Sequence, residues 1–122
     1  IRDHRRVFVA FSNPRLVPGH LLVIPKRHVE KLSELTKEER EKLFETAVEY
    51  QKKILKFASG CDMRQNYRPF LPQSYLKVDH AHMHLLPREN QDQLWERSMR
   101  YEKEIFAPLS DDERKKFTNL LI

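Results

Sequence analysis

Apolar residues near the start of the chain follow the short alternating pattern of β-strands. Residues 6–12 (RVFVAFS) alternate loosely and are rich in valine and phenylalanine, and Leu21–Pro25 forms a second apolar run. Asn13-Pro14 and Pro18-Gly19 lie between these runs, and both are turn-forming pairs. We therefore expect two neighbouring antiparallel strands that are joined by a turn-rich segment.

The clearest helical pattern covers residues 37–58. Thr36 and Glu39 have the spacing of a capping box at its start. Apolar residues then recur along one stripe, at Leu43, Phe44, Ala47, Val48, Ile54 and Leu55. Such a stripe is typical of a helix that packs against a sheet. Ser59-Gly60 is expected to end the helix, with the glycine in the left-handed conformation.

The remaining segments complete an α+β pattern. We expect extended segments at residues 62–67 and 76–86, with a proline-bearing loop at 68–74 between them. Two further helices are expected at residues 91–106 and 110–121. The order of strand, strand, helix, strand, strand and helices implies an antiparallel sheet in an α+β fold.

Composition excludes several kinds of site. The sequence has two glycines, which rules out a glycine-rich phosphate loop, and the single Cys61 rules out an internal disulfide and a cysteine-pair zinc site. No apolar run approaches the roughly 18 residues of a membrane helix, so we expect a cytoplasmic protein without membrane association. The net charge of +5 favours polyanionic partners, which include nucleotides and nucleic acid.

Three of the six histidines occupy every second position in one segment of the chain. These are His80, His82 and His84. In a strand, residues two apart point to the same face, so the three imidazoles would line one face of the sheet. The alternate positions, Ala81, Met83 and Leu85, would then face the core.

Several interpretations of this histidine cluster remain open. In one interpretation the imidazoles are plain surface residues, and in another they share a zinc ion in a zinc-dependent hydrolase. A third interpretation is nucleophilic attack on phosphorus, with His82 in the middle as the nucleophile and its neighbours bonding the phosphate oxygens. A non-catalytic module that binds nucleotides or nucleic acid is a further alternative, supported by the net charge and by aromatic residues near basic ones.

The same residues resemble a known family. His80-Ala81-His82-Met83-His84-Leu85-Leu86 resembles the His-φ-His-φ-His-φ-φ motif of the histidine triad (HIT) superfamily, where φ is an apolar residue. Residues 13–28 (NPRLVPGHLLVIPKRH) look like the strand pair around the family's Pro-Gly-His sequence. Residues 86–88 (LPR) are similar to the fragile-histidine-triad-like and bacterial hydrolase branches. The resemblance covers residues 6–88 of a single domain, 1–122, in which residues 89–122 form a C-terminal helical extension.

This resemblance implies a fold and an activity. The family has a five-stranded antiparallel sheet with a helix packed on it, and its members are usually homodimers. They hydrolyse or transfer nucleoside monophosphates by attack on the α-phosphorus, as in diadenosine polyphosphates or phosphoramidates, and require no metal or other cofactor. By resemblance, His82 is the nucleophile and the backbone carbonyl of His84 accepts from its ring. His20 and His84 then lie near the phosphate oxygens, and His80 orients the site.

The substrate contacts implied by the family fall on less familiar residues. Ser12, with Asn13 beside it, occupies the position eight residues before His20 where the family binds the ribose. The glycine-containing segment before the triad is replaced by a loop without glycine. In that loop and the strand before it, the candidates for binding substrate are Asn66, Gln73, Ser74 and Lys77.

Overall fold

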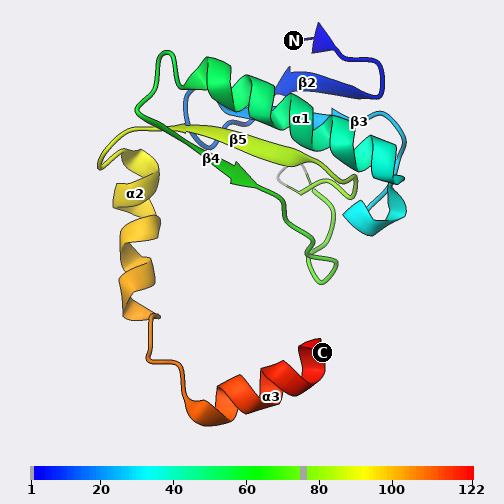
Figure 1. Ribbon diagram of the computed structural model, residues 1–122. Helices are drawn as coiled ribbons and strands as arrows, with labels where there is room; N and C mark the ends of the chain where they lie inside the picture. The colour runs from blue at the N-terminus through cyan, green and yellow to red at the C-terminus, as the bar shows by residue number, and fades with distance from the viewer. Residues whose placement is uncertain (1, 75–76) are drawn as a thin grey trace.

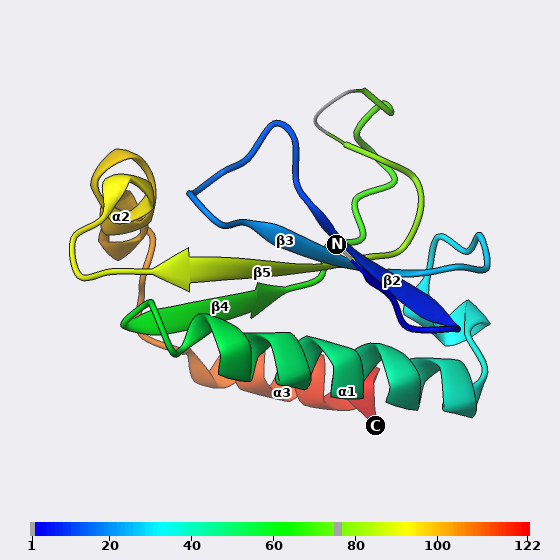
Figure 2. The ribbon, with the colours of Figure 1, turned by 90° about the horizontal axis from the view of Figure 1, so that it is seen from above.

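The computed structural model describes residues 2–74 and 77–122. In these residues, five strands form one antiparallel sheet in the order β1-β2-β3-β5-β4. The strands are β1 (Arg2–Asp3), β2 (Val7–Phe11), β3 (Leu21–Pro25), β4 (Gly60–Arg64) and β5 (Met83–Arg88). Helix α1 (Lys37–Ile54) covers one face of this sheet (Figure 1; Figure 2). The α+β class and the five-stranded sheet predicted from the sequence are therefore confirmed.

The core lies between α1 and the sheet face made by odd-numbered strand residues. Val7, Val9, Val23 and Leu85 are buried there against Leu43, Ala47 and Ile54 of α1. The capping box of Thr36 and Glu39 begins α1 as predicted. The predicted stripe is only half right, since Phe44, Val48 and Leu55 are exposed. A flat sheet covers only one side of a helix, and the other half of the stripe faces away from it.

Several predicted boundaries are wrong. The last helical residue of α1 is Ile54, whose carbonyl accepts from the amides of both Phe57 and Ala58 in a tight turn. Gly60 does not have the expected left-handed conformation and instead begins β4. Strand β4 ends at Arg64, so residues 65–67 lie outside it.

The expected extended segment 76–86 is largely displaced toward the C-terminus. Its first residue lies outside the described residues, and β5 begins only at Met83 and continues to Arg88. The reason is a tertiary contact, because the amide of Ala81 donates to the carbonyl of Val29 at 2.6 Å rather than to a neighbouring strand. Only His84 of the three triad histidines therefore lies within a strand.

The C-terminal segment is helical but is interrupted. The single helix expected at residues 91–106 is divided at Ser98 into α2 (Gln93–Arg97) and the 3-10 helix η2 (Met99–Glu104). Leu94 of α2 is buried against Val17 and Leu86. Helix α3 (Asp111–Leu121) begins at the predicted capping box of Ser110 and is exposed along its whole length, away from the sheet (Figure 1).

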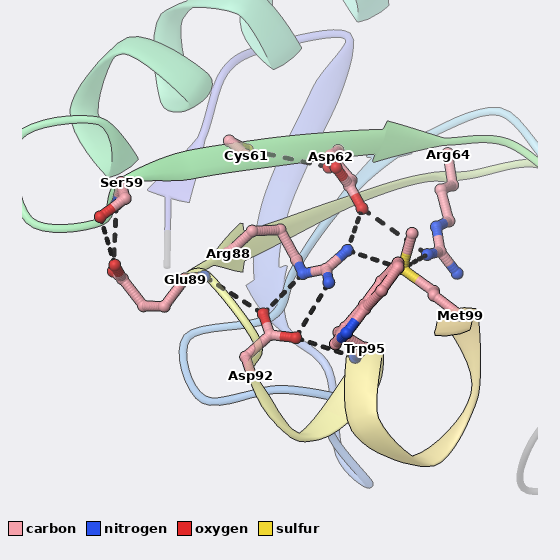
Figure 3. A network of polar contacts seen from close by, with 9 residues as sticks. All are labelled: Ser59, Cys61, Asp62, Arg64, Arg88, Glu89, Asp92, Trp95 and Met99. Atoms are coloured by element: carbon pink, nitrogen blue, oxygen red, sulfur yellow. Dashed lines mark hydrogen bonds and ion pairs between the residues drawn. The ribbon is translucent and has the colours of Figure 1, made fainter. Parts of the chain in front are cut away.

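A cluster of charged residues ties α2 to the sheet (Figure 3). The Arg88 guanidinium donates to both carboxylate oxygens of Asp92, at 2.7 and 2.9 Å, and to Asp62 Oδ2 at 2.6 Å. These bonds hold the pKa of Asp92 far below its usual range and raise that of Arg88. Because Asp62 lies on β4 and Arg88 on β5, the cluster fixes α2 at this end of the two strands.

Within the described part of the chain, no helix is long and apolar enough to cross a membrane.

Candidate functional site

His20, His82 and His84 form a continuous chain of hydrogen bonds on the face of the sheet opposite α1. His20 Nε2 lies 2.8 Å from His84 Nδ1, and His84 Nε2 lies 3.1 Å from His82 Nε2. The chain is anchored by backbone at both ends. The amide of Leu16 donates to His20 Nδ1 at 3.0 Å, and the carbonyl of His80 accepts from His82 Nδ1 at 2.7 Å.

The two backbone anchors determine which ring nitrogen carries each proton. His20 Nδ1 accepts from an amide, so the proton of the neutral ring is on Nε2 and is donated to His84 Nδ1. His84 therefore carries its proton on Nε2 and donates it toward His82 Nε2. His82 donates its Nδ1 proton to the carbonyl of His80, which leaves the Nε2 lone pair as the acceptor. The lone pair of a neutral His82 thus ends the chain on the nitrogen that faces His84.

Burial keeps His20 and His84 neutral. It lowers the pKa of His84 to about 4, and the positive charges of protonated His82 and His20 and of Arg64 and Arg68 act in the same direction. Burial also lowers the pKa of His20, helped by His82 and Arg64. Near neutral pH, His20 and His84 are therefore hydrogen-bond donors without net charge.

His80 faces away from the other two triad histidines. Its Nε2 donates to the carbonyl of Pro25 at 2.8 Å, and its Nδ1 lies 3.2 Å from His28 Nδ1. The expected row of three side chains is therefore reduced to a pair, because only His82 and His84 have adjacent rings, 4.6 Å apart. The expectation for the backbone is wrong, since the carbonyl that accepts from His82 belongs to His80 and not to His84. His80 therefore contributes its carbonyl to the site, while its ring bonds the carbonyl of Pro25.

His28 was missed as a residue of the site. It was only part of the motif around Leu21–Pro25, and its ring reaches His80 because the chain after β3 passes beside residues 80–81. The contact joins residues 52 positions apart, so no local pattern could reveal it.

The predicted ribose-binding residues lie beside His20. The amide of Ser12 donates to the carbonyl of His20 at 2.9 Å, and its hydroxyl donates to the carbonyl of Pro14. Asn13 is exposed at the turn that follows. The structure therefore brings Ser12 to the site, with its hydroxyl turned into its own loop.

The predicted phosphate-binding residues lie in the segment between β4 and His80. Asn66, Lys77 and His80 line one pocket of about 240 Å³. Gln73 accepts from the amide of Asp79 at 3.2 Å, so its side chain supports the loop.

The rest of this loop is held by Lys77. Its backbone pairs with that of Ser74, and its ammonium group donates to the carbonyl of Leu71 at 2.7 Å and to Asp79. The charge of Lys77 is therefore shared with Asp79.

The donor set does not fit a zinc ion. In the described residues, no group of three or more His, Cys, Asp or Glu side chains could hold a metal. Metal ligands need free lone pairs that meet at one point. Here His80 Nε2 donates to Pro25, and the Nε2 proton of His84 points toward His82.

Comparisons with known proteins agree on one family. A model of the HIT domain matches residues 1–91 of the chain. The bifunctional bis(5'-adenosyl)-triphosphatase/adenylylsulfatase FHIT of Arabidopsis thaliana is 32% identical, over 90% of this chain and 67% of its own. The asymmetrical bis(5'-nucleosyl)-tetraphosphatase of Schizosaccharomyces pombe is 33% identical, over 71% of this chain and 48% of its own, so the match spans about half of that protein.

Solved structures give the same fold. A member of the HIT family of proteins from Bacillus subtilis has a TM-score of 0.71 at 21% identity, over 99% of this chain and 83% of its own. A zinc-bound histidine triad family protein from Mycobacterium smegmatis has a TM-score of 0.66 at 23% identity, over 77% of this chain and 68% of its own. At these identities the likeness concerns the fold.

Proposed function

This protein belongs to the HIT domain family, and from the hydrogen bonds that join His20, His84 and His82 we propose that it is a nucleotide hydrolase or nucleotidyl transferase that works through a covalent nucleotidyl-histidine. The observation that carries this proposal is the direction of the hydrogen bonds. The backbone anchors leave the lone pair of His82 on Nε2, where it faces His84. A neutral imidazole with its other nitrogen tied to a carbonyl is a nucleophile that needs no separate base.

In the first step, the lone pair of His82 Nε2 forms a bond to the α-phosphorus of the substrate. The bond from that phosphorus to the leaving group breaks, and its electron pair departs with the leaving group. His82 is then positively charged, and the bond from Nδ1 to the carbonyl of His80 stabilises this charge.

In the second step, water attacks the phosphorus of the nucleotidyl-histidine. The phosphorus–nitrogen bond breaks, its electron pair returns to His82 Nε2, and the water proton is lost to solvent. The product is a nucleoside monophosphate. Another acceptor in place of water makes the same step a nucleotidyl transfer.

His84 and His20 serve the phosphate oxygens in this proposal. The Nε2 proton of His84 points to His82 at 3.1 Å, so an incoming phosphate takes over this donor when the lone pair of His82 turns to phosphorus. The donor carries no charge, since burial keeps the pKa of His84 at about 4. His20 holds His84 in this orientation through the 2.8 Å bond between the two rings.

The substrate class is proposed from the relatives. Their names specify bis(5'-adenosyl) triphosphate and bis(5'-nucleosyl) tetraphosphate hydrolysis and adenylylsulfate cleavage, each a reaction of a nucleotide anhydride. We extend this class to the present chain and include nucleoside phosphoramidates. Ser12 and Asn13 are the proposed ribose contacts, and Asn66, Gln73, Ser74 and Lys77 are the proposed contacts to the phosphates.

The test is turnover of diadenosine triphosphate and adenosine 5'-phosphoramidate by the purified protein with EDTA present. We expect AMP as a product, and a protein adduct of one adenylyl group (the mass of AMP less one water) after rapid acid-free quenching. His82→Gln should lower kcat by at least about 10³-fold and abolish the adduct, because no other group supplies the lone pair. His4→Gln is the control, since His4 bonds Tyr50 away from the chain.

Several outcomes would contradict this mechanism. If His82→Gln retains turnover close to that of the unchanged protein, His82 is not the nucleophile. Activity that is lost in EDTA and restored by zinc would favour a zinc-dependent hydrolase. Tight nucleotide or nucleic-acid binding without turnover would indicate a non-catalytic binding module.

The homodimer implied by the family, the single domain 1–122 and the cytoplasmic location stay predictions.

A further inference from the structure

Arg64 lies directly beside His84 on the catalytic face of the sheet. The register of β4 and β5 pairs these two residues, and paired residues of antiparallel strands point to the same face with close side chains. Cys61 and Met63 of β4 pack toward the core, which confirms that Arg64 faces the other way. Because β5 lies between β3 and β4, Arg64 and β3, which begins directly after His20, lie on opposite sides of His84.

The guanidinium of Arg64 is held in place without being saturated. Its nearest carboxylate oxygen, Asp62 Oδ2, is 3.6 Å away, while the same oxygen accepts from Arg88 at 2.6 Å. Its other contact is the sulfur of Met99 at 3.7 Å (Figure 3). Among the described residues, Arg64 therefore donates no hydrogen bond to an oxygen within 3.5 Å, and its donors are open to a ligand.

The site needs a cation at this place. His20 and His84 are uncharged near neutral pH, as shown above, so they do not balance the negative charge of a polyphosphate. The charge of Lys77 is already shared with Asp79. Arg64 is fixed on a strand, about one third exposed, and its positive charge acts on both His20 and His84.

We propose that Arg64 binds the phosphate group next to the one attacked, on the leaving side of a dinucleoside polyphosphate. This assignment rests on the function proposed above. His82 and His84 serve the attacked phosphate, and Arg64 lies one strand further across the sheet. Neighbouring strands are about 4.8 Å apart, a separation that a phosphate chain and an arginine side chain together span. Arg64 thus selects substrates whose leaving group carries phosphate charge.

The test compares two substrates that transfer the same adenylyl group. Diadenosine triphosphate releases ADP, whereas adenosine 5'-phosphoramidate takes up a proton from solvent on its nitrogen and releases ammonia, which carries no phosphate. For Arg64→Met we expect kcat/KM to fall about 10- to 100-fold with diadenosine triphosphate, as for the loss of a charge-assisted hydrogen bond. With the phosphoramidate the fall should stay below about 3-fold. Arg64→Lys should recover part of the loss because it retains the charge.

Arg97→Met is the matched control, since it removes the same charge from an exposed position on α2. It should leave both substrates unaffected. Equal losses of Arg64→Met on the two substrates, or no loss on either, would overturn the assignment.

Failure of the proposed function has a different signature. In that case the unchanged protein turns over neither substrate, and Arg64 is tested by binding of the methylene-bridged analogue of diadenosine triphosphate. Weaker binding to Arg64→Met than to the unchanged protein and to Arg97→Met would support the phosphate contact. Equal affinity for the three proteins would overturn it.

Discussion

The neutral state of His84 has a consequence for the stability of the protein in acid. An unfolded chain takes up a proton at a histidine near pH 6.5, whereas burial lowers the pKa of folded His84 to about 4. Between these values the unfolded state binds more protons than the folded state, so stability falls as the pH falls. His84 therefore contributes its full stability above pH 6.5 and loses it progressively toward pH 4.

The magnitude follows from the width of this interval. It covers roughly 2.5 pH units, and each is equivalent to about 1.4 kcal/mol, which gives at most about 3.5 kcal/mol. The hydrogen bonds act in the same direction as burial. A second proton on His84 would enter at Nδ1, which already accepts from His20. His20 cannot turn its donor away, because its own Nδ1 accepts from the amide of Leu16.

The assay is urea unfolding of the unchanged protein and of His84→Gln at pH 7.5, 6, 5 and 4. Glutamine offers a donor and an acceptor but does not titrate, so the variant lacks this part of the pH dependence. We expect the difference in unfolding free energy between the two proteins to shift by about 2 to 3 kcal/mol in favour of the variant between pH 7.5 and pH 4. Carboxylates that titrate in this range are common to both proteins and cancel.

The reasoning is refuted if the pH profile of His84→Gln runs parallel to that of the unchanged protein, with a difference in unfolding free energy that is constant within about 0.5 kcal/mol from pH 7.5 to pH 4.

Two further predictions concern the parts of the fold that hold the site. Gly19 has a φ of 81°, and an added Cβ would meet Pro87 Cγ at 3.1 Å, so Gly19→Ala should cost about 1 to 2 kcal/mol in urea unfolding. Gly60→Ala, which meets only ordinary contacts, should stay within about 0.5 kcal/mol, and equal costs would contradict this. Arg88→Met should cost about 2 to 3 kcal/mol by thermal or urea unfolding, because it leaves Asp62 and Asp92 without their partner. The exposed ion pair between Arg114 and Asp111 should contribute less than about 0.5 kcal/mol to the unfolding free energy. A cost for Arg114→Met as large as that for Arg88→Met would show that burial does not determine the strength of these pairs.

Local patterns were sufficient for β2 and β3, because strand patterns and turn residues are local signals, whereas the two-residue β1 carries no pattern that predicts it. Leu21–Pro25 and the capping boxes at Thr36 and Ser110 are where the pattern predicts them. Boundaries failed where a tertiary contact competes with a local pattern. The segment before Met83 alternates well enough for a strand, yet its backbone bonds to Val29 instead of a strand partner.

The site could be predicted only in part of its membership. The spacing of His80, His82 and His84 singled out three of its residues, and the resemblance added His20. The role of His80 was not predictable from period two, because its ring leaves the face on which the other two lie. Likewise, Arg64 gains its place from the pairing of β4 with β5, and that register is set by the whole sheet.

The direction of the histidine chain depends on backbone groups, and side-chain patterns do not encode these. The amide of Leu16 is available to His20 because the chain turns between Leu16 and Gly19, and the left-handed conformation of Gly19 makes this turn possible. If His20 instead had its proton on Nδ1, its Nε2 would accept, His84 would have to donate from Nδ1, and the donor that we propose for the phosphate would be lost. The Pro-Gly-His sequence therefore does more than join β2 to β3. It sets the proton on His84, so that the lone pair of His82 faces the donor that the substrate phosphate takes over in the proposed mechanism.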